Sequence, residues 1–119
     1  RSTFRELMDS NSKEKIQKIA ETTSTTDLKN SLNYFYGYVN LESILDLFKK
    51  RCQNMNVQFR LITINNTIKI IIQHDLGKNW PFFIISQMNS ILNEIKYRII
   101  NDDYNNQGFS FEIVKVGDE

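Results

Sequence analysis

The stretch VQFRLITINNTIKIIIQH, residues 57–74, decides the fold of this 119-residue chain. Two runs rich in β-branched and aromatic residues, 57–64 and 67–74, flank the pair Asn65-Asn66. Such runs are typical of β-strands, and asparagine tolerates the positive φ angle that a two-residue hairpin turn requires. The sequence therefore predicts an antiparallel β-hairpin.

Alternation within the hairpin separates a mostly apolar face from a mostly polar one. Pairing across the turn sets Leu61 opposite Ile70, Phe59 opposite Ile72, and Val57 opposite His74. The apolar face then comprises Val57, Phe59, Leu61, Thr63, Ile68, Ile70, Ile72 and His74. On the polar face, Ile62 and Ile71 are exceptions. We expect the apolar face to meet helices, with His74 on the core-facing side at the end of the sheet.

Helices are predicted on both sides of the hairpin. Before it, apolar residues at helical spacing predict a helix over 41–54 with Asn40 as its N-cap. After it, a long apolar stripe predicts a helix over 80–100, with Pro81 in its first turn, where a missing N–H costs little. A polar loop over 101–108 and a final strand over 109–116 complete the order α-β-β-α-β.

This order predicts an α+β fold with a small antiparallel three-stranded sheet, covered by helices on one face. A right-handed crossover would place the last strand parallel to 67–74 and beside 57–64. Such a sheet leaves two edges open, and pairing with a second chain would protect them. Together with the exceptional Ile62 and Ile71, the open edges predict a homodimer.

Residues 1–39 are predicted to form a helical N-terminal extension that makes one compact domain with the core at 40–119. Ser12 is expected to cap a helix over 13–21, and the hydroxyl run 22–26 to break it. A second short helix would carry Leu28, Leu32 and Phe35, and Gly37 would end it. Because the chain starts at Arg1 without a Met or a signal segment, we expect a fragment of a longer cytoplasmic protein.

Composition argues against several classes of function. The chain has 15 Lys and Arg against 14 Asp and Glu, so it lacks the basic excess of a nucleic-acid-binding domain. One Cys and one His cannot form an internal disulfide or a His-rich metal site. The longest apolar region, 80–100, carries ionisable side chains that are too costly at a bilayer centre. We expect no membrane span, no direct binding of nucleic acid and no cofactor.

A candidate ligand-binding site lies where the run 67–74 leads into the next helix. Its residues are His74, Lys78, Trp80 and Phe83. Aromatic side chains beside a histidine and a lysine suit a flat or apolar ligand, but they can equally close one end of the core. As an acid or base, His74 would need a positioned partner such as Asp75 or Glu94. The sequence offers no complete catalytic set.

The segment His74-Asp75-Leu76-Gly77-Lys78-Asn79-Trp80 resembles a His-x-Leu-Gly-x-x-Trp signature of small, poorly characterised archaeal proteins. Phe4-Arg5-Glu6-Leu7 before a charged helix, Val39-Asn40-Leu41-Glu42 at the start of the next helix, and Cys52 near its end are also similar to those proteins. In them a Ser tends to follow the Trp as a helix cap, whereas this chain has Pro81.

Some of those proteins carry a ribbon-helix-helix DNA-binding segment ahead of this region. The resemblance therefore implies the C-terminal domain of a transcription regulator. We expect a non-enzymatic regulatory or oligomerisation module that senses a small ligand or a partner protein. The alternatives are a small enzyme with His74 as acid or base, and a protein–protein adaptor.

Overall fold

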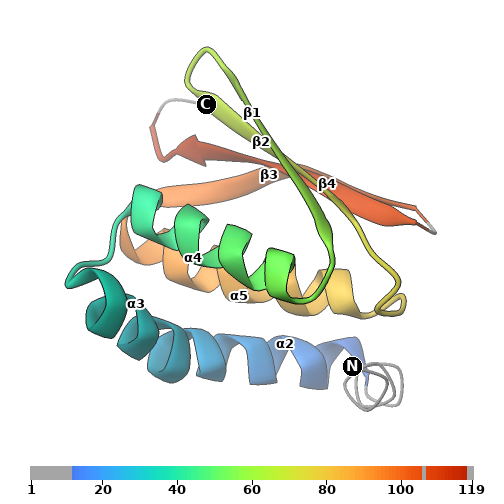
Figure 1. Cartoon of the computed structure of the whole chain (residues 1–119), viewed down its shortest axis with the longest axis horizontal. Helices are drawn as coiled ribbons and strands as arrows, with labels where there is room; N and C mark the ends of the chain where they lie inside the picture. The colour runs from blue at the N-terminus through green and yellow to red at the C-terminus, as the bar shows by residue number, and fades with distance from the viewer. Residues whose placement is uncertain (1–11, 106, 118–119) are drawn as a thin grey trace.

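The computed structural model describes residues 12–105 and 107–117. Within them, four strands form one antiparallel sheet in the order β1-β2-β4-β3, and every helix lies on the same side of it (Figure 1). The strands are β1 (Gln58–Ile64), β2 (Thr67–Gln73), β3 (Tyr97–Asn105) and β4 (Gly108–Lys115). The helical elements are α2 (Lys13–Thr23), the π-helical turn η1 (Ser24–Leu28), α3 (Lys29–Tyr36), α4 (Leu41–Asn54) and α5 (Trp80–Glu94). The α+β class is confirmed.

The predicted hairpin and its register are confirmed over β1 and β2, whereas the predicted pair Val57–His74 lies one residue beyond the ends of the two strands. Leu61 pairs with Ile70 and Phe59 with Ile72, and the turn closes on the pair Ile64–Thr67. Asn65 has a φ of 54°, a conformation that asparagine adopts more readily than most residues. The turn chemistry therefore set the register, and the register places the apolar residues toward the helices.

The sheet has four strands, so the prediction of three was wrong. The helix predicted over 80–100 ends at Glu94, and the segment predicted as its last turn and the following loop forms β3. Ile95 and Ile99 fit a helical stripe, but the second of them lies on a strand. Lys96 breaks the helix with a φ of 67°. A short run of apolar residues is compatible with helix or strand, and long-range pairing decided this one.

The predicted position of the last strand was also wrong. That strand, β4, lies beside β2 and antiparallel to it, not beside β1. The crossover through α5 leads to β3, which runs parallel to β2 without touching it. A second hairpin then inserts β4 between them. The crossover therefore does lead to a strand parallel to β2, but that strand is β3, which was not predicted from the sequence.

Helices α2 and α3 are joined without the predicted break. The chain stays helical through η1, because the threonine hydroxyls bond backward along the helix and not to a competing turn. These hydroxyls donate to the carbonyl oxygen four residues earlier: Thr22 to Lys18, Thr23 to Ile19, and Thr26 to Thr22. At the ends of this helical segment, Ser12 accepts from the N–H of Lys15, and Gly37 ends α3 with a φ of 78°, both as predicted.

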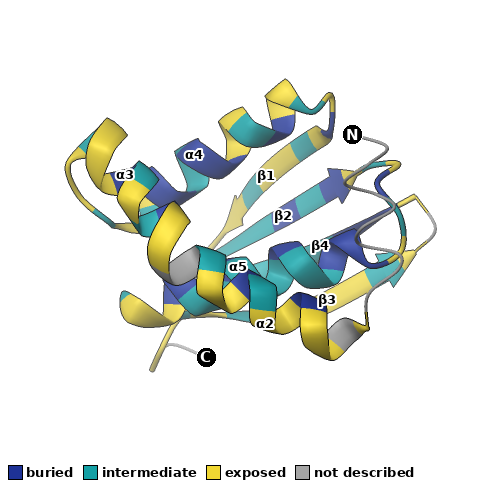
Figure 2. Ribbon diagram, turned by 90° about the horizontal axis from the view of Figure 1, so that it is seen from below, coloured by how far each residue is buried: buried dark blue, intermediate teal, exposed yellow. Residues whose placement is uncertain are grey.

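The core lies between the sheet and α4 and α5, and α2 packs on the outer side of α5 as a third layer (Figures 1 and 2). Leu28 and Leu32 are buried as predicted, but Phe35 is 68% exposed. The half-buried aromatic residue is the next one, Tyr36, which contacts α4. Among the described helices, none is both long and apolar enough to cross a membrane.

Candidate functional site

The structure brings together two of the four residues predicted to form a ligand site. The centroid of the His74 ring lies 4.8 Å from that of Trp80 and 5.6 Å from that of Phe109 on β4. These separations are usual for packed aromatic pairs. Trp80 is only 1% exposed. Lys78 is exposed, and Phe83 is half-buried against the core. The packed rings of His74, Trp80 and Phe109 close the end of the core where β2 leads into α5.

His74 also shapes the connection between β2 and α5. Its Nδ1 accepts a hydrogen bond of 3.1 Å from the backbone N–H of Leu76, which is fully buried. Its backbone N–H donates to the carbonyl of Gln107. The residue therefore continues the pairing of β2 with the second hairpin and folds the next turn back over the core. This geometry gives His74 a structural role that residue type alone could not reveal.

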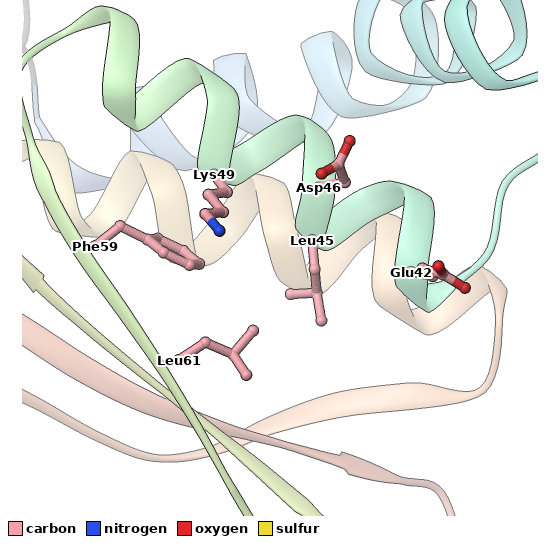
Figure 3. A pocket seen from close by; sticks show the side chains of 6 residues that line it. All are labelled: Glu42, Leu45, Asp46, Lys49, Phe59 and Leu61. Atoms are coloured by element: carbon pink, nitrogen blue, oxygen red, sulfur yellow. The ribbon is translucent and has the colours of Figure 1, made fainter.

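A groove of about 500 Å³ opens between α4 and the edge strand β1 (Figure 3). Residues on one face of α4 and alternate residues of β1 line it: Glu42, Leu45, Asp46, Lys49, Phe59 and Leu61. Helix positions three and four apart share a face, as do strand positions two apart, so both sets line the same space. Three apolar side chains make the floor, and three charged ones make the rim.

The floor of the groove is accessible to a partner. Leu45 and Phe59 are half-buried, and Leu61 is 43% exposed, although all three side chains point into the space between helix and strand. Phe59 also packs edge-to-face on Phe48 in the core, with ring centroids 5.6 Å apart. The floor is thus anchored on one side to the core and open on the other.

The strand beside this groove has an open backbone edge. In an antiparallel hairpin, hydrogen-bonded pairs alternate with pairs that are not bonded, and a two-residue turn closes on a bonded pair. Because that pair here is Ile64–Thr67, Ile62 and Arg60 bond to β2. The N–H and C=O groups of Phe59, Leu61 and Thr63 point away from the sheet. In the described part of the chain, β1 has no neighbour on that side.

One end of the groove rim is tied to α3. The hydroxyl of Tyr36 donates to Oδ2 of Asp46 over 2.5 Å, and Nζ of Lys50 lies 2.9 Å from the same oxygen. These two donors hold the pKa of Asp46 below its ordinary value of 3.8, the tyrosine contributing most. The same hydrogen bond raises the pKa of Tyr36. The network fixes α3 against α4 beside the groove.

We expect this network to make stability depend on pH. A depressed pKa in the folded state stabilises the fold above the unfolded pKa, and the stabilisation is lost as pH falls through the folded value. Asp46→Asn should therefore lower the Tm by about 1–3 °C near pH 7, and the gap should close as the pH falls from the ordinary pKa of 3.8 through the lower folded value. Circular dichroism melts from pH 2 to 7 measure it. In a Tyr36→Phe background the gap should shrink, and a gap independent of pH would contradict the assignment.

The groove was not predicted from the sequence. Leu61 was expected to face the core, because it lies on the apolar face of the predicted hairpin. Strand alternation could have paired Phe59 with Leu61, but only the strand order leaves them at an edge. Cys52 lies on the buried side of α4 and is 1% exposed, and burial raises its pKa to about 12, as expected for an unreactive thiol. Among the described residues, no cluster of His, Cys, Asp or Glu could hold a metal ion.

The fold and the groove together define a class of structure: a small α+β domain with a one-sided antiparallel sheet and an open edge strand under a helix. Comparisons with protein-family models, with curated proteins and with solved structures gave no match to this chain. The function is therefore inferred from the geometry of the molecule itself.

Proposed function

We propose that this domain is a non-enzymatic binding module for an extended segment of a partner protein. The segment would add to the sheet as a further strand beside β1 and place alternate side chains in the groove under α4. The observation that carries the proposal is the coincidence of two features on the same residues. Within the described chain, Phe59 and Leu61 direct backbone N–H and C=O groups toward an edge with no neighbouring strand, and their side chains form an apolar surface toward α4.

Strand addition divides recognition into two parts. Hydrogen bonds to the open edge supply affinity that depends little on sequence, and pockets for alternate side chains supply specificity. Here the floor would take an aliphatic or aromatic side chain against Leu45, Phe59 and Leu61. Lys49, above Phe59, favours an acidic residue at that end of the segment, and Glu42 favours a basic one at the other (Figure 3).

A partner seated in this groove would contact α4, which the Tyr36–Asp46 bond links to α3. Binding would therefore shift the balance between arrangements of the helical layers, as a sensing domain requires. This agrees with a regulatory module, which the resemblance at 74–80 also implies. A small-ligand site at His74, Lys78, Trp80 and Phe83 stays a prediction, and it requires access to the buried Trp80.

Selection from a phage-displayed library of random dodecamer peptides on the immobilised protein tests the proposal. Enriched peptides should carry an apolar residue at alternate positions. Their affinity, measured by fluorescence anisotropy, should fall by about tenfold or more in Leu61→Lys, because the lysine fills the groove floor with a charge. Leu61 is 43% exposed, so this variant should fold normally.

The matched control is Val116→Lys, which makes the same kind of change at an apolar residue that is 51% exposed and does not line the groove. Its affinity for the enriched peptides should equal that of the unmodified chain. The proposal is contradicted if no peptide is enriched, or if the enriched peptides bind Leu61→Lys as tightly as the control.

A further inference from the structure

The face of the sheet opposite the helices is here called the outer face. It carries several aliphatic side chains, whereas a sheet face in contact with water is usually polar. In the described chain no helix covers it (Figure 1). Its residues alternate with those of the core and include Ile62, Ile71 and Ile100, which are half-buried, and Ile64. Ile64 is 56% exposed. A group of aliphatic residues close together on one flat surface is typical of an interaction site.

Charges on the outer face are placed in matching rows across the strands. The register of the sheet gives one row in the order Ile62, Lys69, Glu112, Ile100. The next row reads Arg60, Ile71, Ser110, Asp103. In both of these rows the cation lies on the β1–β2 half of the sheet and the anion on the β4–β3 half, so the two halves of these rows are complementary in charge. Outside them, Arg98 on β3, which pairs with Val114, places one cation on the β4–β3 half.

We propose that the outer face binds a second copy of this chain through a two-fold axis parallel to the strands. This rotation keeps each row at its own level and exchanges the two halves of the sheet. Lys69 then faces the partner's Glu112, Arg60 faces the partner's Asp103, and Ile62 faces the partner's Ile100. Each contact occurs twice, as an isologous interface requires. Two sheets stacked in this way pack with their strands nearly aligned.

The alternative two-fold axis, perpendicular to the strands, fits less well. It would place β1 over the partner's β1 and β2 over the partner's β2. With the axis on the first row, Lys69 meets Lys69 and Glu112 meets Glu112. With the axis between the rows, Ile62 meets Arg60 and Ile100 meets Asp103. Like charges and buried unpaired charges both oppose association. The strand-parallel axis sets one charge, that of Arg98, opposite the partner's Ile64, but it pairs Lys69 with Glu112 and Arg60 with Asp103, so the pattern favours this axis.

A small pocket on the outer face supports the same arrangement. It has a volume of about 140 Å³ and lies over β2, β4 and β3. Its lining includes Asp103, Ser110, Gln73 and Asn105. The strand-parallel axis brings the partner's exposed Arg60 to this position. A guanidinium can there meet a carboxylate and neutral acceptors together.

The size of the outer face sets the expected strength of the dimer. Four strands at about 4.8 Å and seven residues at about 3.3 Å give a surface of about 19 by 23 Å. That area is at the low end for specific interfaces. We therefore expect a reversible dimer with a dissociation constant in the micromolar range or higher, and we expect salt to weaken it.

Two charge reversals and their mixture test the proposal by sedimentation velocity on the full chain, from about 1 µM to about 1 mM. Lys69→Glu places two carboxylates opposite each other twice in the dimer, and Glu112→Lys does the same with two ammonium groups. Each variant alone should dimerise at least about tenfold more weakly than the unmodified chain. A 1:1 mixture of the two should form heterodimers as readily as the unmodified chain forms homodimers.

The mixture separates contacts between chains from contacts within one chain. Lys69 and Glu112 are also neighbours within each sheet, and a purely intramolecular effect would persist in the mixture. Melting curves verify that both variants fold. An unmodified chain that stays monomeric to about 1 mM, single variants that dimerise normally, or a mixture that stays monomeric would each overturn the proposal. The groove under α4 lies on the other side of the sheet, so this test is independent of peptide binding.

Discussion

Gly108→Ala is expected to lower the free energy of unfolding by about 2–4 kcal/mol. A methyl group at this position would lie 2.1 Å from the carbonyl oxygen of Ile72 on the neighbouring strand. No real contact is that short, and the obstructing atom is backbone, so β4 and β2 must separate. The adjacent bond from the N–H of His74 to the carbonyl of Gln107, now 3.0 Å, would be strained in the same movement.

Urea unfolding followed by circular dichroism measures this loss, and Gly37→Ala is the matched control. Gly37 has open space around it and a φ of 78°. Alanine there should lower the free energy of unfolding by about 1 kcal/mol, because it must adopt a left-handed conformation. The close approach of β4 to β2 would be refuted by a Gly108→Ala loss no greater than that of the control.

Trp80→Ala is expected to cost about 3–5 kcal/mol, the usual range for removing a large aromatic side chain from a core. Trp80 is the first residue of α5 and is 1% exposed, and its ring packs on β4, with its centroid 5.8 Å from that of Phe109. A domain of this size has a total stability of only about 5–15 kcal/mol. We therefore expect the variant to be largely unfolded in moderate urea, where the unmodified chain is native.

Tyr34→Ala is the control for Trp80→Ala, because Tyr34 is an aromatic residue that is 83% exposed. Its loss should change stability by less than about 0.5 kcal/mol. Both variants are compared by circular dichroism, since Trp80 is the only tryptophan in the chain and its removal abolishes the fluorescence signal. Equal stabilities for the two variants would mean that Trp80 does not hold the core at the end of β2.

Local signals carried the parts of the fold that sequence reasoning predicted. Asn40 caps α4 with a reciprocal bond to Ser43, and Asn65 turns the first hairpin, each through chemistry within a few residues. The error arose where local patterns are ambiguous. Ile95 and Ile99 are spaced as on a helix, and a polar run follows them. Only pairing with β4 makes this segment a strand, and no local rule shows that pairing.

The candidate sites show the same division. The aromatic cluster around His74 was predicted as a group because its members are close in sequence, but its burial depends on β4, far along the chain. The groove depends on β1 being an edge strand, which follows from the order β1-β2-β4-β3 and not from the strand itself. Similarly, Ile62 and Ile71 were noticed as exceptions, but the matching charges appear only when four strands are aligned.

The most direct test of the proposed function is amide hydrogen exchange, residue by residue, with and without an enriched peptide. Strand addition predicts that the N–H groups of Phe59, Leu61 and Thr63 exchange about tenfold or more slowly when the peptide is bound. The N–H groups of Arg60 and Ile62, which already bond to β2, should change little. Unchanged exchange at the three outward amides, or new protection confined to residues 74–83, would contradict peptide binding at the edge of β1.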